Sequence, residues 1–402
     1  MNWRTRILAT IKGDPTDQLP FVPRLDIWYK ANKLAGSLPA KYRDATLMEI
    51  AQDLDVGYHG VVPDFRDFES KDDQVGYALG LLNLRSLPYR ISFEELDLRS
   101  RINGDLVEVE IRTPYGKINT KVLYDESMRR AGSTLAHTAE HAIKGTDDYM
   151  AVAYIFRNVQ VEPAYESYLE YKEFVGERGI AVAFNLLSAS PMHLVMKELM
   201  PFELFVYKLH DNRKGLELLA DSISQFYEKL FEVVLGCPAE VIFSGANYDS
   251  TITSPPFFKQ YITPYLSKQS RMAHSSGKYI LTHTDGENDG LLEEYLASQI
   301  DIADSICPSP MTRLTIREIK KVLGNKVTIW GGMPSICLLE DSMSNYEFEV
   351  YLNQFLEDVG SGDHLIVSFA DTTPPKAKFD RIEKVAKLVK SFGPVMPKTN
   401  IE

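Results

Sequence analysis

Eight short apolar runs alternate with longer segments of helical periodicity along this chain. The runs are rich in Val and Ile, which is typical of strands buried on both faces of a parallel sheet. They occupy residues 21–28, 58–65, 179–187, 239–249, 278–286, 299–307, 326–334 and 364–375. A strand followed by a helix, repeated along the chain, predicts right-handed βα units.

The helical segments between these runs have clear apolar stripes. One stripe is formed by Leu291, Leu292, Tyr295 and Leu296, and residues 314–323 form another that stops at Gly324, a favourable C-terminal cap. Together the patterns predict an α/β protein with a (β/α)8 TIM barrel. A doubly wound open sheet is the structural alternative, but the first predicted strand is not followed by the GxGxxG pattern of dinucleotide-binding folds.

Residues 89–126 depart from this pattern, because apolar and polar residues alternate there. Turn signals stand at Asn103–Gly104 and at Pro114–Gly116, which indicates hairpins. We therefore expect an antiparallel β insertion near residues 89–126, acting as a lid or as part of a dimer interface. The stretch from there to residue 178 is expected to be mostly helical, and residues 1–402 are expected to form a single barrel domain.

Charge and cysteine usage exclude several classes of protein. The net charge of −12 disfavours nucleic acid and anionic membrane surfaces as partners. The three cysteines are far apart and form no CxxC pair, which argues against a disulfide scaffold and fits a reducing compartment. Neither a signal peptide nor a membrane-spanning run is visible, so a cytoplasmic location is expected.

The fifth predicted strand ends in the most polar stretch, "HTDGENDG". His283 and Asp285 are two residues apart, so both side chains point to the same face of the strand. An imidazole and a carboxylate on one face form half of a metal site, and a third ligand must come from elsewhere in the fold. In the alternative interpretation, His283 satisfies a buried polar group and Asp285 caps a helix that begins near Glu287.

The other strand exits matter because barrel enzymes build their sites at the C-terminal ends of the strands. The other polar or reactive residues there are Arg24, Asp26, Asp64, Asn185, Asn247, Tyr248, Asp249, Glu287, Asp304, Cys307, Ser368 and Asp371. Cys307 is a candidate ligand or nucleophile, or alternatively a small buried hydrophobe. Asp371 faces the barrel mouth or caps the helix that follows.

Several motifs occur in a familiar order: "RILATIKG", "LPFVP", "NYDSTIT", "FFKQYITPYL", "HTDG", "GGMPS" and "SFADTTPP". In these the chain resembles the uroporphyrinogen decarboxylase superfamily, which includes corrinoid-dependent methyltransferases. The resemblance implies the (β/α)8 fold and a homodimer. True uroporphyrinogen decarboxylases carry an Arg-Gln-Ala-Gly-Arg stretch after the first strand, of which this chain keeps Arg24 alone. Tetrapyrrole decarboxylation is therefore not expected.

The methyltransferase branch of that superfamily looks closer. Its members hold zinc with a His-x-Cys pair at the fifth strand and a later Cys beside the last strand, and the matching positions here are His283, Asp285 and Asp371. The resemblance thus implies a divalent metal, with zinc as the first expectation. Two carboxylates make a harder site, which favours an oxygen-bearing methyl donor over a thiol. The methyl group would pass to a corrinoid (cobalamin) on a partner protein, in an O-demethylation.

Roles follow for the remaining residues. Under the methyltransferase hypothesis, Asn247, Tyr248 and Glu287 orient the donor or a proton. A metal-independent decarboxylase of a small acid is the second hypothesis, with Asp26 or Asp64 transferring the proton and Arg24 holding the carboxylate. The third hypothesis is a non-catalytic binding subunit. The expected substrate contacts are Arg24, Asp64, Asn247, Tyr248 and Cys307, and the expected catalytic residues are Asp26, Tyr248 and Glu287.

Overall fold

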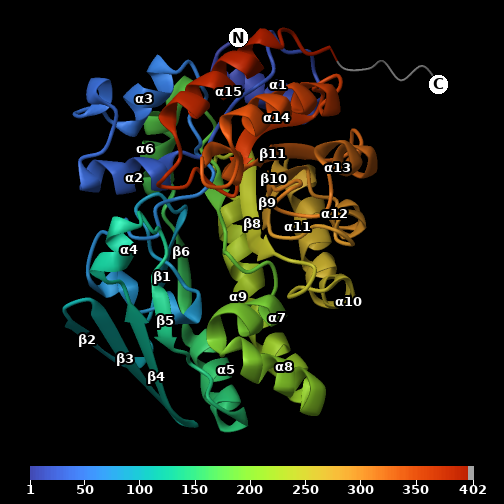
Figure 1. The fold of residues 1–402 in the computed structure, drawn as a ribbon. Helices are drawn as coiled ribbons and strands as arrows, with labels where there is room; N and C mark the ends of the chain where they lie inside the picture. Colours follow the sequence, from blue (N-terminus) through green and yellow to red (C-terminus); the bar gives the residue numbers. More distant parts are fainter. Residues whose placement is uncertain (397–402) are drawn as a thin grey trace.

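The computed structural model describes residues 1–396 (Figure 1). Eight parallel segments form a closed ring in it. Six of them are strands in the spatial order β7-β8-β9-β10-β11-β12, and every neighbouring pair is parallel. Their bounds are β7 Ala183–Phe184, β8 Val241–Tyr248, β9 Tyr279–Asp285, β10 Ile302–Ile306, β11 Thr328–Pro334 and β12 Leu365–Ala370.

Two irregular segments, 20–22 and 57–60, close the ring between β12 and β7. Val22 N donates to Val367 O at 2.9 Å, and Gly57 N donates to Phe21 O at 2.9 Å. On the other side, Val182 N donates to the carbonyl oxygen of Gly60 at 3.0 Å. The predicted (β/α)8 barrel is therefore confirmed, with each of its parallel segments inside one of the eight apolar runs or at its edge.

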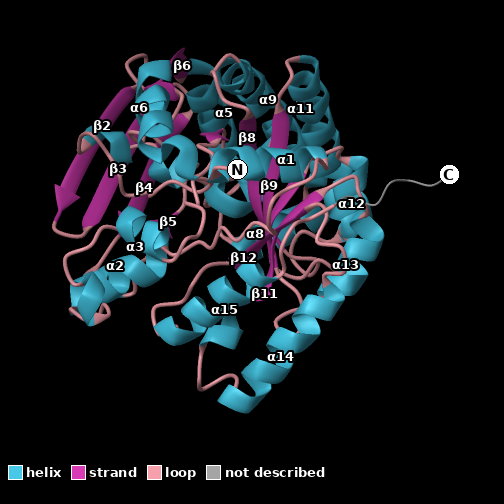
Figure 2. Ribbon diagram, turned by 90° about the horizontal axis from the view of Figure 1, so that it is seen from above, coloured by secondary structure: helices cyan, strands magenta, loops and turns pink. Residues whose placement is uncertain are grey.

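Helices surround the ring on its outer side (Figure 2). The longer ones are α1 Trp3–Lys12, α2 Asp26–Ala35, α5 Tyr149–Asn158, α6 Tyr165–Val175, α8 Phe202–Asp211, α9 Arg213–Leu235, α11 Thr263–Ser275, α14 Asn345–Asp358 and α15 Phe379–Ser391. Shorter ones are α3 Leu47–Asp53, α4 Glu126–Arg130, α7 Pro191–Leu194, α10 Pro255–Phe257, α12 Leu292–Ala297 and α13 Ile316–Leu323. Within residues 1–396, none of the helices has both the length and the apolar composition that crossing a membrane requires.

The first apolar run is shorter as a strand than its sequence suggests. Helix α2 already begins at Asp26, so the prediction of a strand through residue 28 is wrong for the last three residues. A carboxylate in the first turn suits the positive end of the helix dipole, and Trp28 faces the core as part of the helix. Asp26 is thereby placed at the junction between strand and helix, at the barrel mouth.

The antiparallel insertion is confirmed and is larger than predicted. Strands β2 Asp97–Asn103, β3 Leu106–Thr113 and β4 Gly116–Leu123 pair through turns at the two sites that the sequence indicated. Strand β5 His137–Glu140 extends this sheet, and β1 Tyr89–Ser92 pairs with β6 Gln160–Pro163. The stretch up to residue 178 is mostly helical, as predicted, with α5 and α6 as its main elements. The strands β5 and β6 interrupt it, and they are too short to show a period of two.

The glycine pair of "GGMPS" lies within β11 rather than in a loop after it. Gly331 has φ +148°, and a Cβ there would meet the backbone N and O of Ile306 at 2.8 Å. The glycine thus lets β11 approach β10 closely, which is a structural reason for this part of the motif.

Candidate functional site

Three side chains meet at the C-terminal ends of the barrel strands, which form the barrel mouth. His283 and Asp285 come from β9, and Asp371 directly follows β12. One potential ligand atom from each of them lies within 4.8 Å of the others. The structure thus brings together the three residues that the sequence proposed as metal ligands, and we refer to them below as the ligand cluster.

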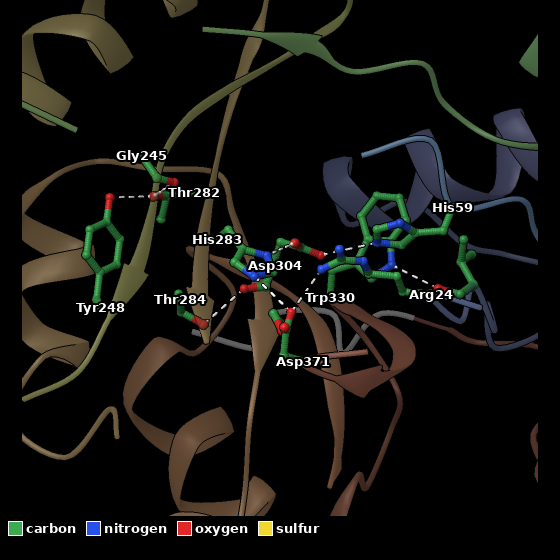
Figure 3. A network of polar contacts seen from close by, with 12 residues as sticks. Arg24, His59, Gly245, Tyr248, Thr282, His283, Thr284, Asp304, Trp330 and Asp371 are labelled. Atoms are coloured by element: carbon green, nitrogen blue, oxygen red, sulfur yellow. Dashed lines mark hydrogen bonds and ion pairs between the residues drawn. The ribbon is translucent and has the colours of Figure 1, made fainter. Parts of the chain in front are cut away.

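The imidazole of His283 is fixed on both sides by carboxylates (Figure 3). Its Nδ1 lies 2.6 Å from Oδ2 of Asp304, and its Nε2 lies 2.9 Å from Oδ1 of Asp371. Only 4% of His283 and 2% of Asp304 are exposed to solvent. Asp304 therefore determines the ring orientation, and Nε2 is the nitrogen that faces the ligand cluster.

Charge explains the ionisation state of this chain of residues. Burial by itself would lower the pKa of His283, but Asp371 and Asp304 outweigh it and raise this pKa to about 10. Burial opposes the charge of Asp304 as well, yet the hydrogen bond from His283 lowers the pKa of Asp304 to about 2. Without a metal, His283 is thus an imidazolium between two carboxylates at neutral pH.

Arg24 connects the first barrel segment to the last. Its Nε donates to Oδ1 of Asp26 at 3.1 Å, and its Nη1 donates to Oδ1 of Asp371 at 3.1 Å. Ser305 Oγ donates to the same oxygen of Asp371 at 3.2 Å. Despite burial, Arg24 and His283 hold the pKa of Asp371 well below its usual range. None of these contacts uses Oδ2 of Asp371.

Asp285 sits in a strained backbone conformation. Its φ is +64°, and Asn247 and Ser305 on the neighbouring strands have φ values of +62° and +63°. Left-handed residues other than glycine cost free energy and gather at functional sites. Asp285 does not cap a helix, because α12 begins only at Leu292. That structural interpretation is therefore wrong, and burial together with Asp371 instead raises the pKa of Asp285.

His59 belongs to this site, although sequence reasoning missed it. Its Nε2 lies 3.7 Å from Oδ1 of Asp304, and its ring meets the edge of Trp330 with ring centroids 5.5 Å apart. Trp330 Nε1 in turn donates to Val22 O at 3.2 Å. The available signal was an imidazole inside the second predicted strand, at a position that faces the barrel interior.

Three of the predicted residues share a cavity beside the ligand cluster. Arg24, Asp26 and Asp64 all line this first cavity, which has a volume of about 440 Å³ and also includes His59 in its wall. Asp64 is paired with Lys30 Nζ at 2.5 Å. Because Arg24 contacts both Asp26 and Asp371, it forms the boundary between this cavity and the ligand cluster.

Tyr248 is not brought to the ligand cluster. It is fully buried, and its hydroxyl lies 2.8 Å from Oγ1 of Thr282 (Figure 3). Thr282 Oγ1 donates to Gly245 O at 3.0 Å, so the hydroxyl of Tyr248 is the donor in the first contact. Asn247, by contrast, is exposed. The tyrosine thus supports the barrel wall at the position where the sequence suggested a substrate contact.

Glu287 and Cys307 lie near the mouth but are engaged locally. The carboxylate of Glu287 accepts hydrogen bonds from the backbone N of Asp289 and of Arg313, both at 3.0 Å. Cys307 is buried, and burial together with Asp285 and Asp371 raises the pKa of its thiol to about 12. The thiol is therefore neutral at physiological pH, which does not suit a nucleophile.

Comparison with known proteins finds one matching family model and a solved structure with a similar fold. The model of the family "Uroporphyrinogen decarboxylase (URO-D)" matches residues 197–392, a segment that includes His283, Asp285, Asp304 and Asp371. The solved structure of a methyltransferase from Methanosarcina mazei superposes with a TM-score of 0.52 at 14% identity, covering 98% of this chain and 99% of that one. A search among curated proteins finds no match.

The structural likeness shows the shared fold, and the family model adds the sequence pattern of the half of the barrel that carries the ligand cluster. The resemblance to the uroporphyrinogen decarboxylase superfamily, inferred above from short motifs, is thereby confirmed.

Proposed function

We propose that this protein is a methyltransferase that moves a methyl group from a small O-methyl donor to a corrinoid carried by a partner protein. The proposal includes a divalent metal ion, with zinc as the first candidate. The observation that carries it is the placement of His283 between Asp304 on one side and Asp371 on the other, with Asp285 close by. In metal sites, a ligating histidine commonly donates its second ring nitrogen to a carboxylate in this way.

The residues present fit such an ion. His283 would offer Nε2, and Asp285 and Asp371 would each offer one carboxylate oxygen, since these atoms already lie within 4.8 Å of one another. A set of one nitrogen and two oxygens would leave room on such an ion for a substrate oxygen. When bound, the metal would polarise the ether oxygen of the donor as a Lewis acid.

The chain's own groups prepare this chemistry. Asp304 keeps the proton on Nδ1 of His283, so that Nε2 can lose its proton to the solvent and face the metal. Arg24 and Ser305 hold Oδ1 of Asp371, which fixes the orientation of that carboxylate. In the transfer, the donor oxygen keeps the electron pair of the broken C–O bond and takes up a proton. Asp26 lies on the other side of Arg24, where it accepts a hydrogen bond from that guanidinium, so the proton would come from the solvent.

A decarboxylase is the second candidate, because Arg24, Asp26 and Asp64 line a cavity as that hypothesis required. The ion pairs of Arg24 argue against this second candidate. The guanidinium already pairs with Asp26 and Asp371, and so it has little capacity left for a substrate carboxylate. The name of the structurally similar methyltransferase supports the first candidate as well.

Metal analysis and a methyl-transfer assay test the proposal directly. The protein is purified without chelators, its metal content is measured, and methoxylated compounds are offered together with reduced cobalamin. We expect His283→Ala to lose both the bound metal and methyl transfer. His210→Ala is the matched control, since His210 is exposed on α8 and pairs only with its neighbour Asp211 among the described residues. If His283→Ala keeps its metal and its activity, the assignment is wrong.

A further inference from the structure

A second cavity lies on the Asp285 side of the ligand cluster and has no role so far. Its volume is about 260 Å³. Its wall is formed by the antiparallel insertion, by residues 77–82, by Leu187 after β7, and by Lys197 and Glu198. Leu187 O accepts a hydrogen bond from Ala246 N at 2.6 Å, and Ala246 pairs with His283 between β8 and β9, so the cavity lies close to the strands that lead to the ligand cluster. Lys197 also interacts electrostatically with Asp285.

Lys197 is the unusual member of this wall. Its Nζ is shielded from solvent and has no hydrogen-bond partner. Burial lowers its pKa, and Glu198 and Asp285 only partly offset this effect. An ammonium group in such a place costs free energy unless a negative charge arrives to pair with it. Arg24 on the other side of the ligand cluster is already paired, whereas Lys197 is not.

The rest of the wall combines apolar side chains with the polar residues His137, Thr138, His141 and Glu198. Leu82, Leu135 and Leu187 contribute aliphatic side chains, and Tyr77 contributes an aromatic ring. The hydroxyl of Tyr77 accepts a hydrogen bond from Ala136 N at 2.8 Å, which ties the ring to the segment that enters β5. Lys197 itself lies in a π-helical turn, Val195–Leu199, a feature that often occurs at functional sites.

We propose that this cavity binds the methyl donor, and that Lys197 pairs with a carboxylate on it. The donor is then a small methoxylated aromatic acid, with its ring against Tyr77 and the leucines and its methoxy group directed to the ligand cluster. The volume suits this class, since it lies below the roughly 300–1,000 Å³ of pockets for drug-sized ligands. The inference rests on the proposed function for the chemistry, but the binding site can be tested separately.

The test measures binding to the whole protein by calorimetry, without corrinoid. The probes are the three isomers of methoxybenzoate and, as neutral counterparts, the three isomers of methoxytoluene. We expect at least one of the acids to bind to the parent protein. Lys197→Met should lower the affinity for that acid at least tenfold and should leave the affinity for the neutral compounds unchanged. Lys197→Arg keeps the charge and should retain most of the affinity. Lys214→Met, a substitution at an exposed position of α9, should behave like the parent protein.

Thermal unfolding is a second measurement, and it shows whether the Lys197→Met variant is folded. The bound acid should raise the Tm of the parent protein and not that of Lys197→Met, whereas the ligand-free variant should be at least as stable as the parent. The proposal is overturned if no methoxybenzoate binds, or if Lys197→Met binds it as tightly as the parent does. Lysine-dependent binding without methyl transfer would instead refute the proposed function and leave this site standing.

Discussion

Nε2 of His283 lies 2.9 Å from Oδ1 of Asp371, and the Nη1 atom of Arg24 reaches the same oxygen at 3.1 Å. A single carboxylate oxygen thus connects the first, fifth and last segments of the barrel. In the absence of metal, this carboxylate stabilises two cations, and a divalent ion would have to replace the proton of His283. The relationship between Asp371 and its two cationic neighbours determines how the site should respond to pH and to mutation.

Metal affinity should rise with pH. Asp371 and Asp304 raise the pKa of His283 to about 10, whereas a metal binds only the neutral imidazole. Below that pH, a proton competes with the metal, so the affinity should increase about tenfold per pH unit for one released proton. Calorimetric zinc titrations at pH 6.5, 7.5 and 8.5, in buffers of different ionisation enthalpy, would measure how the zinc affinity changes with pH and how many protons are released on binding. A flat profile would refute this account of His283.

Loss of Arg24 should destabilise the metal-free protein. Arg24→Met leaves Asp26 without its cation and Asp371 with His283 alone, and removing one partner of a buried ion pair costs about 3 kcal/mol or more. The loss should be smaller with zinc bound, because the metal also supplies positive charge. Urea unfolding measures both states. Arg317→Met is the control, since that side chain is exposed and pairs with Asp358 at the surface. Equal effects of the two substitutions would contradict the prediction.

The placement of the ligand cluster can be predicted from the sequence, because it depends on the alternation of side chains along one strand and on the order of the strands in the chain. Two residues apart on one strand, His283 and Asp285 had to share a face, and Asp371 had to stand at the exit of the last strand. The partner of His283 could not be derived in the same way. Asp304 lies opposite His283 in the register between β10 and β9, and a single sequence does not reveal register.

Tyr248 shows a second limit of the sequence. Its place at a strand exit suggested a substrate contact, but β8 and β9 change register between Phe243 and Ala246. Gly245 and Asn247 also adopt positive φ values, +78° and +62°. A bulge of this kind turns the following side chains to other faces, and so Tyr248 points into the barrel wall. Likewise, Lys197 lies in a π-helical turn, which the helical period of 3.6 residues does not predict.

The cysteines should be unreactive in the folded protein. Cys237, Cys307 and Cys337 are all buried, and burial is the main reason that the pKa of each thiol is raised to about 12. A thiol reagent at pH 8 should therefore modify none of them until urea is added, after which three thiols per chain should react. Rapid labelling of Cys307 in the folded protein would revive its earlier interpretation as a nucleophile or ligand.

Asp304 should control the metal without touching it. Asp304→Asn keeps the size of the side chain and a carbonyl oxygen for Nδ1 of His283, but it removes the charge that lies 2.6 Å from that nitrogen. Losing such a supporting carboxylate typically lowers metal affinity or activity about 10–100-fold. Competition with a chelator at fixed pH would measure the affinity, and Asp211→Asn, at an exposed site on α8, serves as the control. An unchanged zinc affinity in Asp304→Asn would show that Asp304 only fills space behind the ring, and it would weaken the assignment of His283 as a ligand.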